Sequence, residues 1–412
     1  MHPIVSALRH HKTAVILLSV EIALTCAIVT NALFLIRDRI SAMQATTGIA
    51  TDELVWARTQ GLDLGLPSPT AAAAPENLAE ADLAALRAMP GVRSAVLTNG
   101  LPLVGSYMST NVYRKPGDKR SHASNVVIYI GTPGTVDTLG IELAEGRDFS
   151  PGEYADYDPF EEDSAPPPAA IVTRAMADEL WPGEDPLGKA LYLDDEDPRP
   201  TRVVGVASHL LDPTVGTGDG DERNVLLPSE KLENNRMYVL RVDRASRDAV
   251  ARDLPGVLAG VDPARMVNKH EVYAQTVEDA FRGDRAMVWL LLVVIACLLA
   301  LTALGVVGLS SFWVQQRTHQ IGVRRAVGAT RGDILRHFLI ENFLIVSLGI
   351  VAGSAAAVGL NLWLMHHYEL ARLPLAWLPS GALVLWALGL AAAIGPAMRA
   401  AAVPPAMATR AN

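Results

Sequence analysis

The chain has 412 residues, of which 50% are hydrophobic and 19% charged, with a mean hydropathy of +0.23 and a net charge of −9. These averages combine two kinds of segment: residues 37–285 carry 25 Lys and Arg against 40 Asp and Glu, a net charge of −15, and the rest has a net charge of +6. Such an acidic segment excludes nucleic acid as a partner, because it cannot neutralise phosphates. Both cysteines, Cys26 and Cys297, lie in apolar runs, so we expect no disulfide in the acidic segment and no cysteine metal site.

The first apolar run, residues 14–36, is expected to cross a membrane and to stay attached. It has 23 residues and one charge, Glu21. Its aliphatic and Phe residues favour insertion by roughly 0.3–0.6 kcal/mol each, which outweighs the roughly 3 kcal/mol cost of one central acid. A cleaved signal peptide would have a shorter apolar stretch followed by small residues, whereas this run leads into Arg37, Asp38 and Arg39. We expect Glu21 to face other helices and to be hydrogen-bonded.

Residues 37–285 predict a large mixed α+β domain, in a pattern that allows two lobes. Short runs rich in Val, Ile and Leu predict strands, and a capping box of Asn77 and Glu80 opens a helix that ends at Pro90. Residues 271–284 look helical and contain no Pro, which predicts one continuous helix into the second apolar run. The expected strands are 53–59, 92–97, 126–130, 169–173, 202–207, 225–227 and 237–242, and further helices are 175–180 and 247–254.

Three more apolar runs follow, and the first of them is unusually long. Residues 286–313 contain no charge over 28 positions, and a helix of that length would measure about 42 Å against the roughly 30 Å of a hydrocarbon core. Residues 338–365 and 380–398 are the third and fourth crossings.

Basic residues gather near the N-terminus, in the tail and between crossings two and three. The positive-inside rule therefore places both termini and that loop in the cytoplasm, with the acidic domain outside.

One segment imitates a nucleotide-binding loop. Residues 183–189 satisfy GxxxxGK, but Ala190 stands where a Mg²⁺-binding Ser or Thr is needed, and Trp181 and Pro182 precede the segment instead of a strand. We therefore predict a turn and no ATP hydrolysis by this chain. The acidic run 194–197 fits no EF-hand spacing, and a solvated loop is the commoner structure for such a run. No grouping of nucleophile, base and acid stands out, so we predict no catalytic residue, cofactor or metal site.

The most specific segment is a cationic loop after the second crossing. Residues 315–345 read QQRTHQIGVRRAVGATRGDILRHFLIENFLI. Residues 317–327 can form a short helix that Gly328 ends, and Thr330 can cap the helix that enters the membrane. Five Arg against one Asp suit the loop to a groove on an acidic partner, although such arginines also simply set the topology.

This stretch resembles the signature of the FtsX-like permeases, and within them the MacB-type ABC transporter subunits, in which a coupling helix docks on an ATPase. TPGTVDTLGIELAEGRDFSPGE (132–153), AAIVTRAMADELWPGEDPLGKAL (169–191) and RVVGVASH (202–209) resemble the MacB-type periplasmic domain. The ending GPAMRAAAVPPAMATR (395–410) is similar to the family's last crossing. Family members often carry Glu where this chain has Gln316 and Gln320, so the loop is more cationic and any salt bridges of those acids are in doubt.

The resemblance implies a non-catalytic permease of the bacterial inner membrane that transmits ATP-driven motion to a periplasmic domain, for export or efflux. Only 13 residues precede the first apolar run, where MacB carries its ATPase, so the ATPase is expected to be a separate polypeptide that binds ATP and Mg²⁺. Further expected partners are a second permease, identical or homologous, and membrane lipid, with a periplasmic adaptor as an additional candidate. The ATPase-coupling residues that the resemblance implies are Arg317, Ile321, Gly322, Arg324, Arg325, Ala326, Gly328 and Ala329.

Four residues inside the apolar runs are candidates for helix packing. Gly349 and Gly353 form a GxxxG pattern in the third run, and Gly305 and Gly308 lie in the second. Small residues let helices approach closely, within one chain or across a dimer. Glu341 lies one helical turn after a histidine near the cytoplasmic end, and we expect it to pair locally or to extend to the membrane surface.

Two other functions share this architecture. Some FtsX-like proteins use ATP-driven motion to regulate cell-wall hydrolases or to report on antibiotics, and others extract lipoproteins. The external segment has 249 residues, which is similar to the MacB type and unlike the small external domain of division-type members. The predicted segments are 1–36 (cytoplasmic N-terminus and first crossing), 37–285 (MacB-like external domain), 286–314 (second crossing), 315–337 (coupling loop), 338–365 (third crossing), 366–379 (short external loop), 380–398 (fourth crossing) and 399–412 (cytoplasmic tail).

Overall fold

The computed structural model divides the chain into two compact units, which we describe separately. The helical unit comprises Met1–Met43 and Asp284–Asn412, and the α+β unit comprises Gln44–Gly283. The structure describes residues 12–61, 75–104, 109–117, 122–157, 164–195, 197–213, 222–232, 237–263, 265–368 and 373–402.

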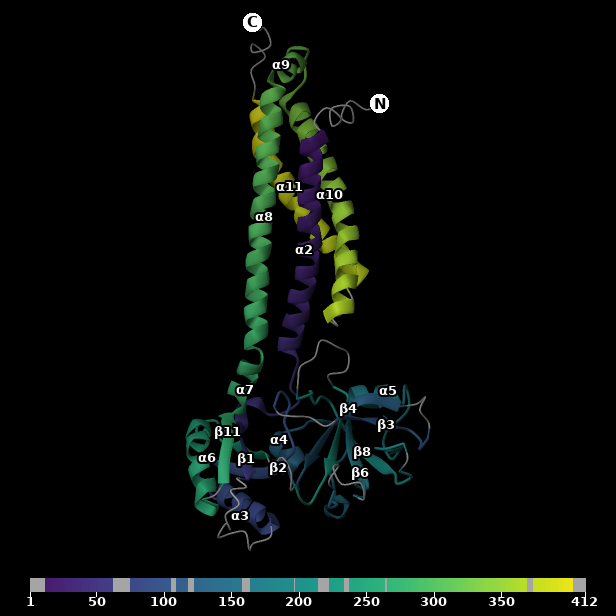
Figure 1. Ribbon diagram of the computed structural model, residues 1–412, viewed down its shortest axis with the longest axis vertical. Helices are drawn as coiled ribbons and strands as arrows, with labels where there is room; N and C mark the ends of the chain where they lie inside the picture. Colours follow the sequence, from purple (N-terminus) through teal and green to yellow (C-terminus); the bar gives the residue numbers. More distant parts are fainter. Residues whose placement is uncertain are drawn as a thin grey trace. The chain divides into compact units, whose positions relative to one another are not determined.

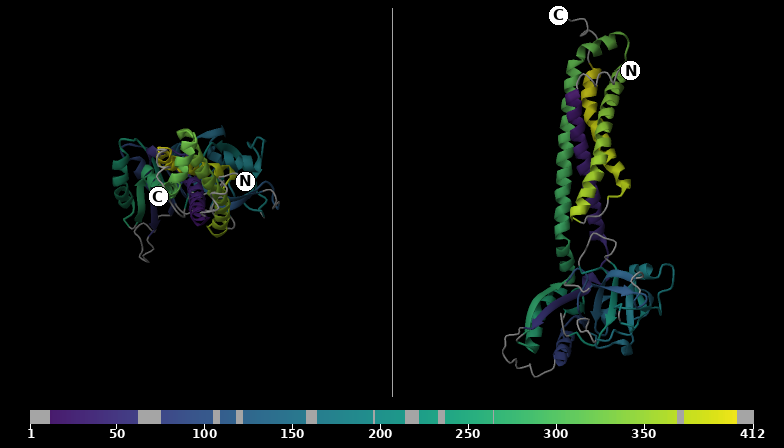
Figure 2. Two further views of the ribbon diagram at one scale, coloured as in Figure 1. Left: turned by 90° about the horizontal axis from the view of Figure 1, so that it is seen from above. Right: turned by 45° about the vertical axis from the view of Figure 1, so that its right-hand side comes forward.

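The helical unit contains four long helices, which run alongside one another in both side views (Figures 1 and 2). Among the described residues, four helices are long and apolar enough to cross a membrane, as predicted. The shorter α9 joins two of the long helices, and a short η3 turn precedes the last. The helices are α2 (Lys12–Gln44), α8 (Arg282–Gln316), α9 (Thr318–Ala326), α10 (Arg331–Tyr368) and α11 (Leu378–Ala401), with η3 at Leu375–Trp377.

The α+β unit is built on a mixed sheet that confirms the predicted fold class. In the described residues the sheet has 11 strands in the order β11-β1-β10-β2-β4-β9-β6-β8-β5, with β3 added to β4 and β7 to β8. The strands are β1 (Leu54–Gly61), β2 (Val92–Thr98), β3 (Ser109–Tyr113), β4 (His122–Gly131), β5 (Leu143–Gly146), β6 (Ala169–Thr173), β7 (Ala190–Leu191), β8 (Thr201–Ala207), β9 (Asn224–Pro228), β10 (Met237–Val242) and β11 (Arg265–Val272). The helices are α3 (Pro75–Arg87), α4 (Thr135–Leu139), α5 (Arg174–Leu180), α6 (Arg247–Val261) and α7 (Tyr273–Ala280), with 3-10 turns η1 (Thr51–Glu53) and η2 (Pro151–Glu153).

Both faces of this sheet are buried, which explains why its central strands are continuous apolar runs. Successive side chains of a strand point to opposite faces. In β1, Val55 belongs to one hydrophobic cluster and Trp56 to the other, and in β10 the same holds for Leu240 and Val239. Helices α3 and α6 pack together near β2 and β11 (Figure 1).

The sheet forms two lobes, because its two halves are joined by little backbone pairing. Between β2 and β4 the only paired residues are Thr98 and Gly131. One lobe holds β11, β1, β10 and β2 with α3 and α6, and the other holds β4, β9, β6, β8 and β5 with α5. The first lobe is tied internally by the buried Tyr238, whose hydroxyl donates to Asp82 of α3.

Two helix predictions differ from the structure. The helix expected over 271–284 begins at Tyr273, because Glu271 and Val272 pair with β1 as the end of β11. From Tyr273 the chain continues to Gln316 as one helical span of 44 residues, in which the single turn residue Phe281 lies between α7 and α8. The buried Phe281 side chain anchors this turn. Helix α6 does not end at residue 254 but continues through Pro255, because Leu258 repeats the buried face of the preceding turns, and that burial outweighs the helix-breaking cost of proline.

Strands β3, β5, β7 and β11 were not predicted. They carry weak apolar alternation, and each of the four pairs with a single strand of the sheet. Their extended conformation depends on pairing with strands distant in sequence, so propensity alone does not identify them.

Candidate functional site

Helix α9 forms where the cationic loop was predicted to contain a helix. It ends because Gly328 adopts a left-handed backbone with φ of +108°, and the Ala329 amide then donates to the carbonyl of Arg324 at 3.1 Å. Thr330 caps α10 as predicted: the Asp333 amide donates to Thr330 Oγ1 at 3.2 Å, and the Thr330 amide donates back to the Asp333 carboxylate at 2.9 Å. The segment between α9 and α10 is therefore a defined turn, made by Gly328 and by the Thr330 cap.

The inner side of α9 packs against the helical unit. Ile321 is 4% exposed and belongs to a cluster with Ile334, Phe338 and Ala397. Gly322 is also buried. These two residues of the predicted coupling set therefore hold the helix in place and are not available to a partner.

A buried ion pair fixes the start of α9. The Arg317 Nη1 atom donates to both carboxylate oxygens of Glu341 in α10 at 2.9 Å, and the two side chains are 16% and 2% exposed. The guanidinium also lies 5.8 Å from the ring centre of Trp313. The expectation that Glu341 pairs locally or reaches the surface is wrong, because the α8–α9 turn brings an arginine 24 residues away against it.

The outer face of α9 combines positive charge with exposed apolar side chains. Arg324 and Ala326 are exposed, and Val323 and Val327 are 44% and 84% exposed. Gly328 is exposed as well, whereas Arg325 and Ala329 are half-buried. Apolar side chains beside an arginine can supply both contact area and charge to an interface with another protein. Sequence reasoning included Ala326 but not Val323 or Val327, whose exposure only the tertiary packing reveals.

Glu21 faces α8, but its hydrogen bonding differs from the expectation. A Cβ atom at Gly305 would lie 2.8 Å from Glu21 Oε2, so this glycine makes room for the carboxyl group. The buried Oε1 has no hydrogen-bond donor among the described residues. One turn further along, Thr25 and Thr302 hydroxyls are 3.0 Å apart, which adds a second polar contact between α2 and α8.

The predicted packing glycines lie between helices of this same chain. A Cβ at Gly349 would lie 2.6 Å from Ile22 Cγ2, and one at Gly353 would lie 2.5 Å from Cys26 Cβ. Helix α2 therefore occupies the GxxxG face of α10, so this face is not free for a second copy. Gly308 has no heavy atom within 4 Å of such a Cβ.

The GxxxxGK segment forms turns in the α+β unit. Gly183 and Gly188 both have positive φ, and the two-residue strand β7 follows where a phosphate-binding loop needs a helix. Within the described ranges, no group of three or more His, Cys, Asp or Glu is placed to hold a metal ion. In the 194–197 run, Asp197 pairs with Arg199 at 2.8 Å.

A rigid loop connects β5 to η2 in the α+β unit. Arg147 forms two hydrogen bonds with the Glu153 carboxylate, at 2.8 and 2.6 Å, and Ser150 completes a capping box with the same residue. The Arg147 hydrogen bonds lower the pKa of Glu153 to about 2. The loop carries Phe149 and Tyr154, whose rings lie 5.9 Å apart in a T-shaped arrangement.

We expect this loop to loosen in acid. Because the pKa of Glu153 is about 2 in the folded chain and 4.5 otherwise, its contribution is complete above pH 4.5 and is lost as the pH falls toward 2. Solvent screening limits the contribution to about 1 kcal/mol. Amide hydrogen exchange of residues 147–154 should be slower in the wild type than in Glu153→Gln at pH 6, and the two should converge only below the folded pKa of about 2. An equal difference at both pH values would contradict the assignment.

Comparison with known proteins supports this architecture. The MacB-like periplasmic core domain family matches residues 16–257, and the FtsX-like permease C-terminal family matches residues 292–405. A macrolide export ATP-binding/permease protein, MacB 2 of Yersinia pestis bv. Antiqua, is 29% identical over 205 residues, covering 47% of this chain and 29% of that protein. The ABC transporter permease YknZ of Bacillus subtilis is 23% identical over 306 residues, covering 72% of this chain and 70% of that permease.

Solved structures of low similarity include two external domains. The periplasmic region of MacB from Actinobacillus actinomycetemcomitans aligns with a TM-score of 0.34 and 15% identity, covering 58% of this chain and 98% of that one. The extracellular domain of a YknZ transporter from Gram-positive bacteria aligns with a TM-score of 0.33 and 16% identity, covering 52% of this chain and all of that one.

Four apolar helices with an α+β unit inserted after the first define a multi-pass membrane protein of the permease class. Since the periplasmic core family matches more than half of the sequence, the chain belongs to the MacB-type, FtsX-like family of ABC transporter permeases. It spans about a third of the length of the curated MacB relatives that it matches.

Proposed function

We propose that the chain is the permease subunit of an ABC exporter of the bacterial inner membrane. In this proposal an ABC ATPase binds the outer face of α9 from the cytoplasm and drives motion of the α+β unit in the periplasm. The observation that carries the proposal is that Arg324 on α9 and Val327 directly after α9 are both exposed, whereas Ile321 on the opposite side of the helix is buried. The names of the MacB relatives, which describe macrolide export, support export as the direction.

Motion is passed along α8 and α2, the two helices whose chain continues into the α+β unit. Their ends are joined by a salt bridge of 3.2 Å between Arg39 and Asp284 and by apolar contacts of Ile36 and Ile295. Because these contacts join α2 to α8, a displacement of α9 moves both helices and so reaches both places where the chain passes into the α+β unit.

The apolar surface of α8 is left for lipid or for a second permease. Trp289, Leu290 and Leu304 are highly exposed on it. Such a surface is stable only when a hydrocarbon core or another helix covers it. A periplasmic adaptor remains an additional partner of the α+β unit in this proposal.

The test is whether ATPase binding is lost when the positive charge on the outer face of α9 is replaced by negative charge. The double variant Arg324→Glu/Val327→Asp should reduce the ABC ATPase that copurifies with the tagged chain at least about tenfold, because it places two acids where a cation and an apolar side chain make contact. Arg285→Glu, an exposed charge reversal near the start of α8 and away from α9, serves as the control and should retain the ATPase. Undiminished copurification by the double variant would remove the basis for coupling through α9.

A further inference from the structure

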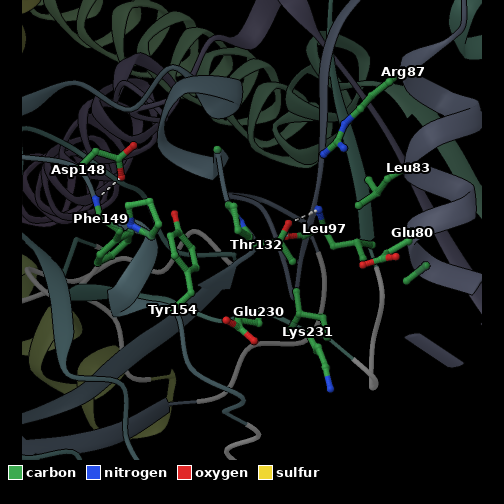
Figure 3. Close-up of a pocket in the computed structure, with 15 residues that line it drawn as sticks. Glu80, Leu83, Arg87, Leu97, Thr132, Asp148, Phe149, Tyr154, Glu230 and Lys231 are labelled. Carbon is green, nitrogen blue, oxygen red and sulfur yellow. Dashed lines mark hydrogen bonds between the residues drawn. The ribbon is translucent and has the colours of Figure 1, made fainter. Parts of the chain in front are cut away.

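The α+β unit contains a cavity of about 680 Å³, large enough for an organic molecule. It is lined on one side by α3 and on the other by the 148–154 loop, and Leu97 and Thr132 lie between them (Figure 3). The Leu97 amide donates to Thr132 Oγ1 at 2.9 Å, so the cavity adjoins the narrow junction between the two lobes.

Three carboxylates line this cavity, at Glu80, Asp148 and Glu230. Among the described residues, Glu80 and Glu230 have no side-chain hydrogen bond or ion pair. Asp148 accepts a hydrogen bond from the Phe149 amide at 2.6 Å and is half-buried. Burial raises the pKa of Asp148, while the hydrogen bond from the Phe149 amide lowers it in part.

The two cations of the lining are engaged with groups outside it. The guanidinium of Arg87 donates from Nε and Nη2 to the carbonyl oxygen of Ala95, at 3.2 and 2.7 Å. Lys231 Nζ lies 3.6 Å from the carboxylate of Asp156, which does not line the cavity. Both side chains keep their positive charge, so the lining combines three carboxylates with two cations and has an excess of one negative charge.

Aromatic rings complete the lining. Phe149 and Tyr154 stand on the loop that the Arg147–Glu153 pair and the Ser150 capping box hold in place. Ring faces attract organic cations, and a ring pair fixed before binding costs no ordering entropy. Leu83, Leu97 and Leu232 supply apolar contact area.

We propose that this cavity binds a lipophilic organic cation, with the positive group near the carboxylates and the apolar groups against the leucines and rings. That the exporter handles such cations rests on the proposed function. Binding of the cation to the cavity requires neither the ATPase nor nucleotide. A cation is favoured because the carboxylates of the lining outnumber its cations by three to two, and Glu80 and Glu230 have no partner among the described residues.

The test compares two ions of the same shape and opposite charge. Equilibrium dialysis of the full chain in lipid nanodiscs, corrected with empty nanodiscs, should show saturable binding of tetraphenylphosphonium and none of tetraphenylborate. The triple variant Glu80→Gln/Asp148→Asn/Glu230→Gln should bind the cation at least about tenfold more weakly, since each partly screened carboxylate raises the affinity for the cation a few-fold. Ala79→Trp, which fills the cavity without changing charge, should also abolish binding, and Glu142→Gln, an exposed acid outside the lining, should not.

Equal binding of both ions by the wild type, or full cation binding by a folded triple variant, would overturn the proposal. The comparison of the two ions on the wild type decides the question even where a variant fails to fold. Cation binding together with intact ATPase copurification by the α9 double variant would leave the cavity assignment standing and overturn the coupling role.

Discussion

Arg317→Met should lower the stability of the helical unit by about 3–5 kcal/mol, the usual effect of leaving one partner of a buried ion pair without compensation. Glu341 is 2% exposed, and its two oxygens accept hydrogen bonds from Arg317. Without the guanidinium, the carboxylate must either take up a proton or draw water into the helix contact. Denaturant unfolding of the purified chain in detergent, followed by tryptophan fluorescence, measures the loss.

The double variant Arg317→Met/Glu341→Leu separates the contribution of the ion pair to stability from that of general packing. It should recover a substantial part of the stability, because two apolar side chains of similar size can replace a buried pair at little cost. The recovered chain should nevertheless transmit motion poorly, since the start of α9 is no longer fixed to α10. Copurified ATPase would then hydrolyse ATP without a response in the α+β unit. Strictly additive losses in the two single variants would show that Arg317 and Glu341 act independently.

Replacement of Gly353 should have the second large effect. A Cβ there lies 2.6 Å from the Ala23 carbonyl oxygen and 2.5 Å from Cys26 Cβ, and neither is the flexible end of a long side chain. Gly353→Ala should therefore cost about 1–3 kcal/mol, and Gly353→Leu should force α2 away from α10 and sharply reduce the folded yield. Thermal unfolding and size-exclusion profiles in detergent report both outcomes.

Gly359 provides the matched control for this prediction. It lies on the same helix, is exposed, and has no heavy atom within 4 Å of an added Cβ. Gly359→Leu should leave folding unchanged. If Gly353→Leu and Gly359→Leu behave alike, close packing of α2 on α10 is not what the glycine provides.

The elements that sequence patterns located best are those whose environment is uniform along their length. The four crossings are long apolar helices, and β6 and β10 begin and end as predicted because both faces of the sheet are buried there. Apolar runs of this kind need no knowledge of their neighbours, since burial on all sides is itself the signal. The α9 helix and its Thr330 cap were likewise found from local chemistry.

The number of crossings, the insertion of an acidic α+β unit between the first two and the family could all be predicted from the amino-acid sequence, because they depend on apolar length, charge and ordered motifs. The pairing of Glu341 with Arg317, the packing of α2 on Gly353 and the exposure of Val327 became known from the folded chain alone. Each of these joins residues far apart in sequence or depends on which side of a helix is covered. The cavity beside the lobe junction has the same origin, since its carboxylates come from α3, the 148–154 loop and the segment after β9, and the sheet topology alone brings them to one space.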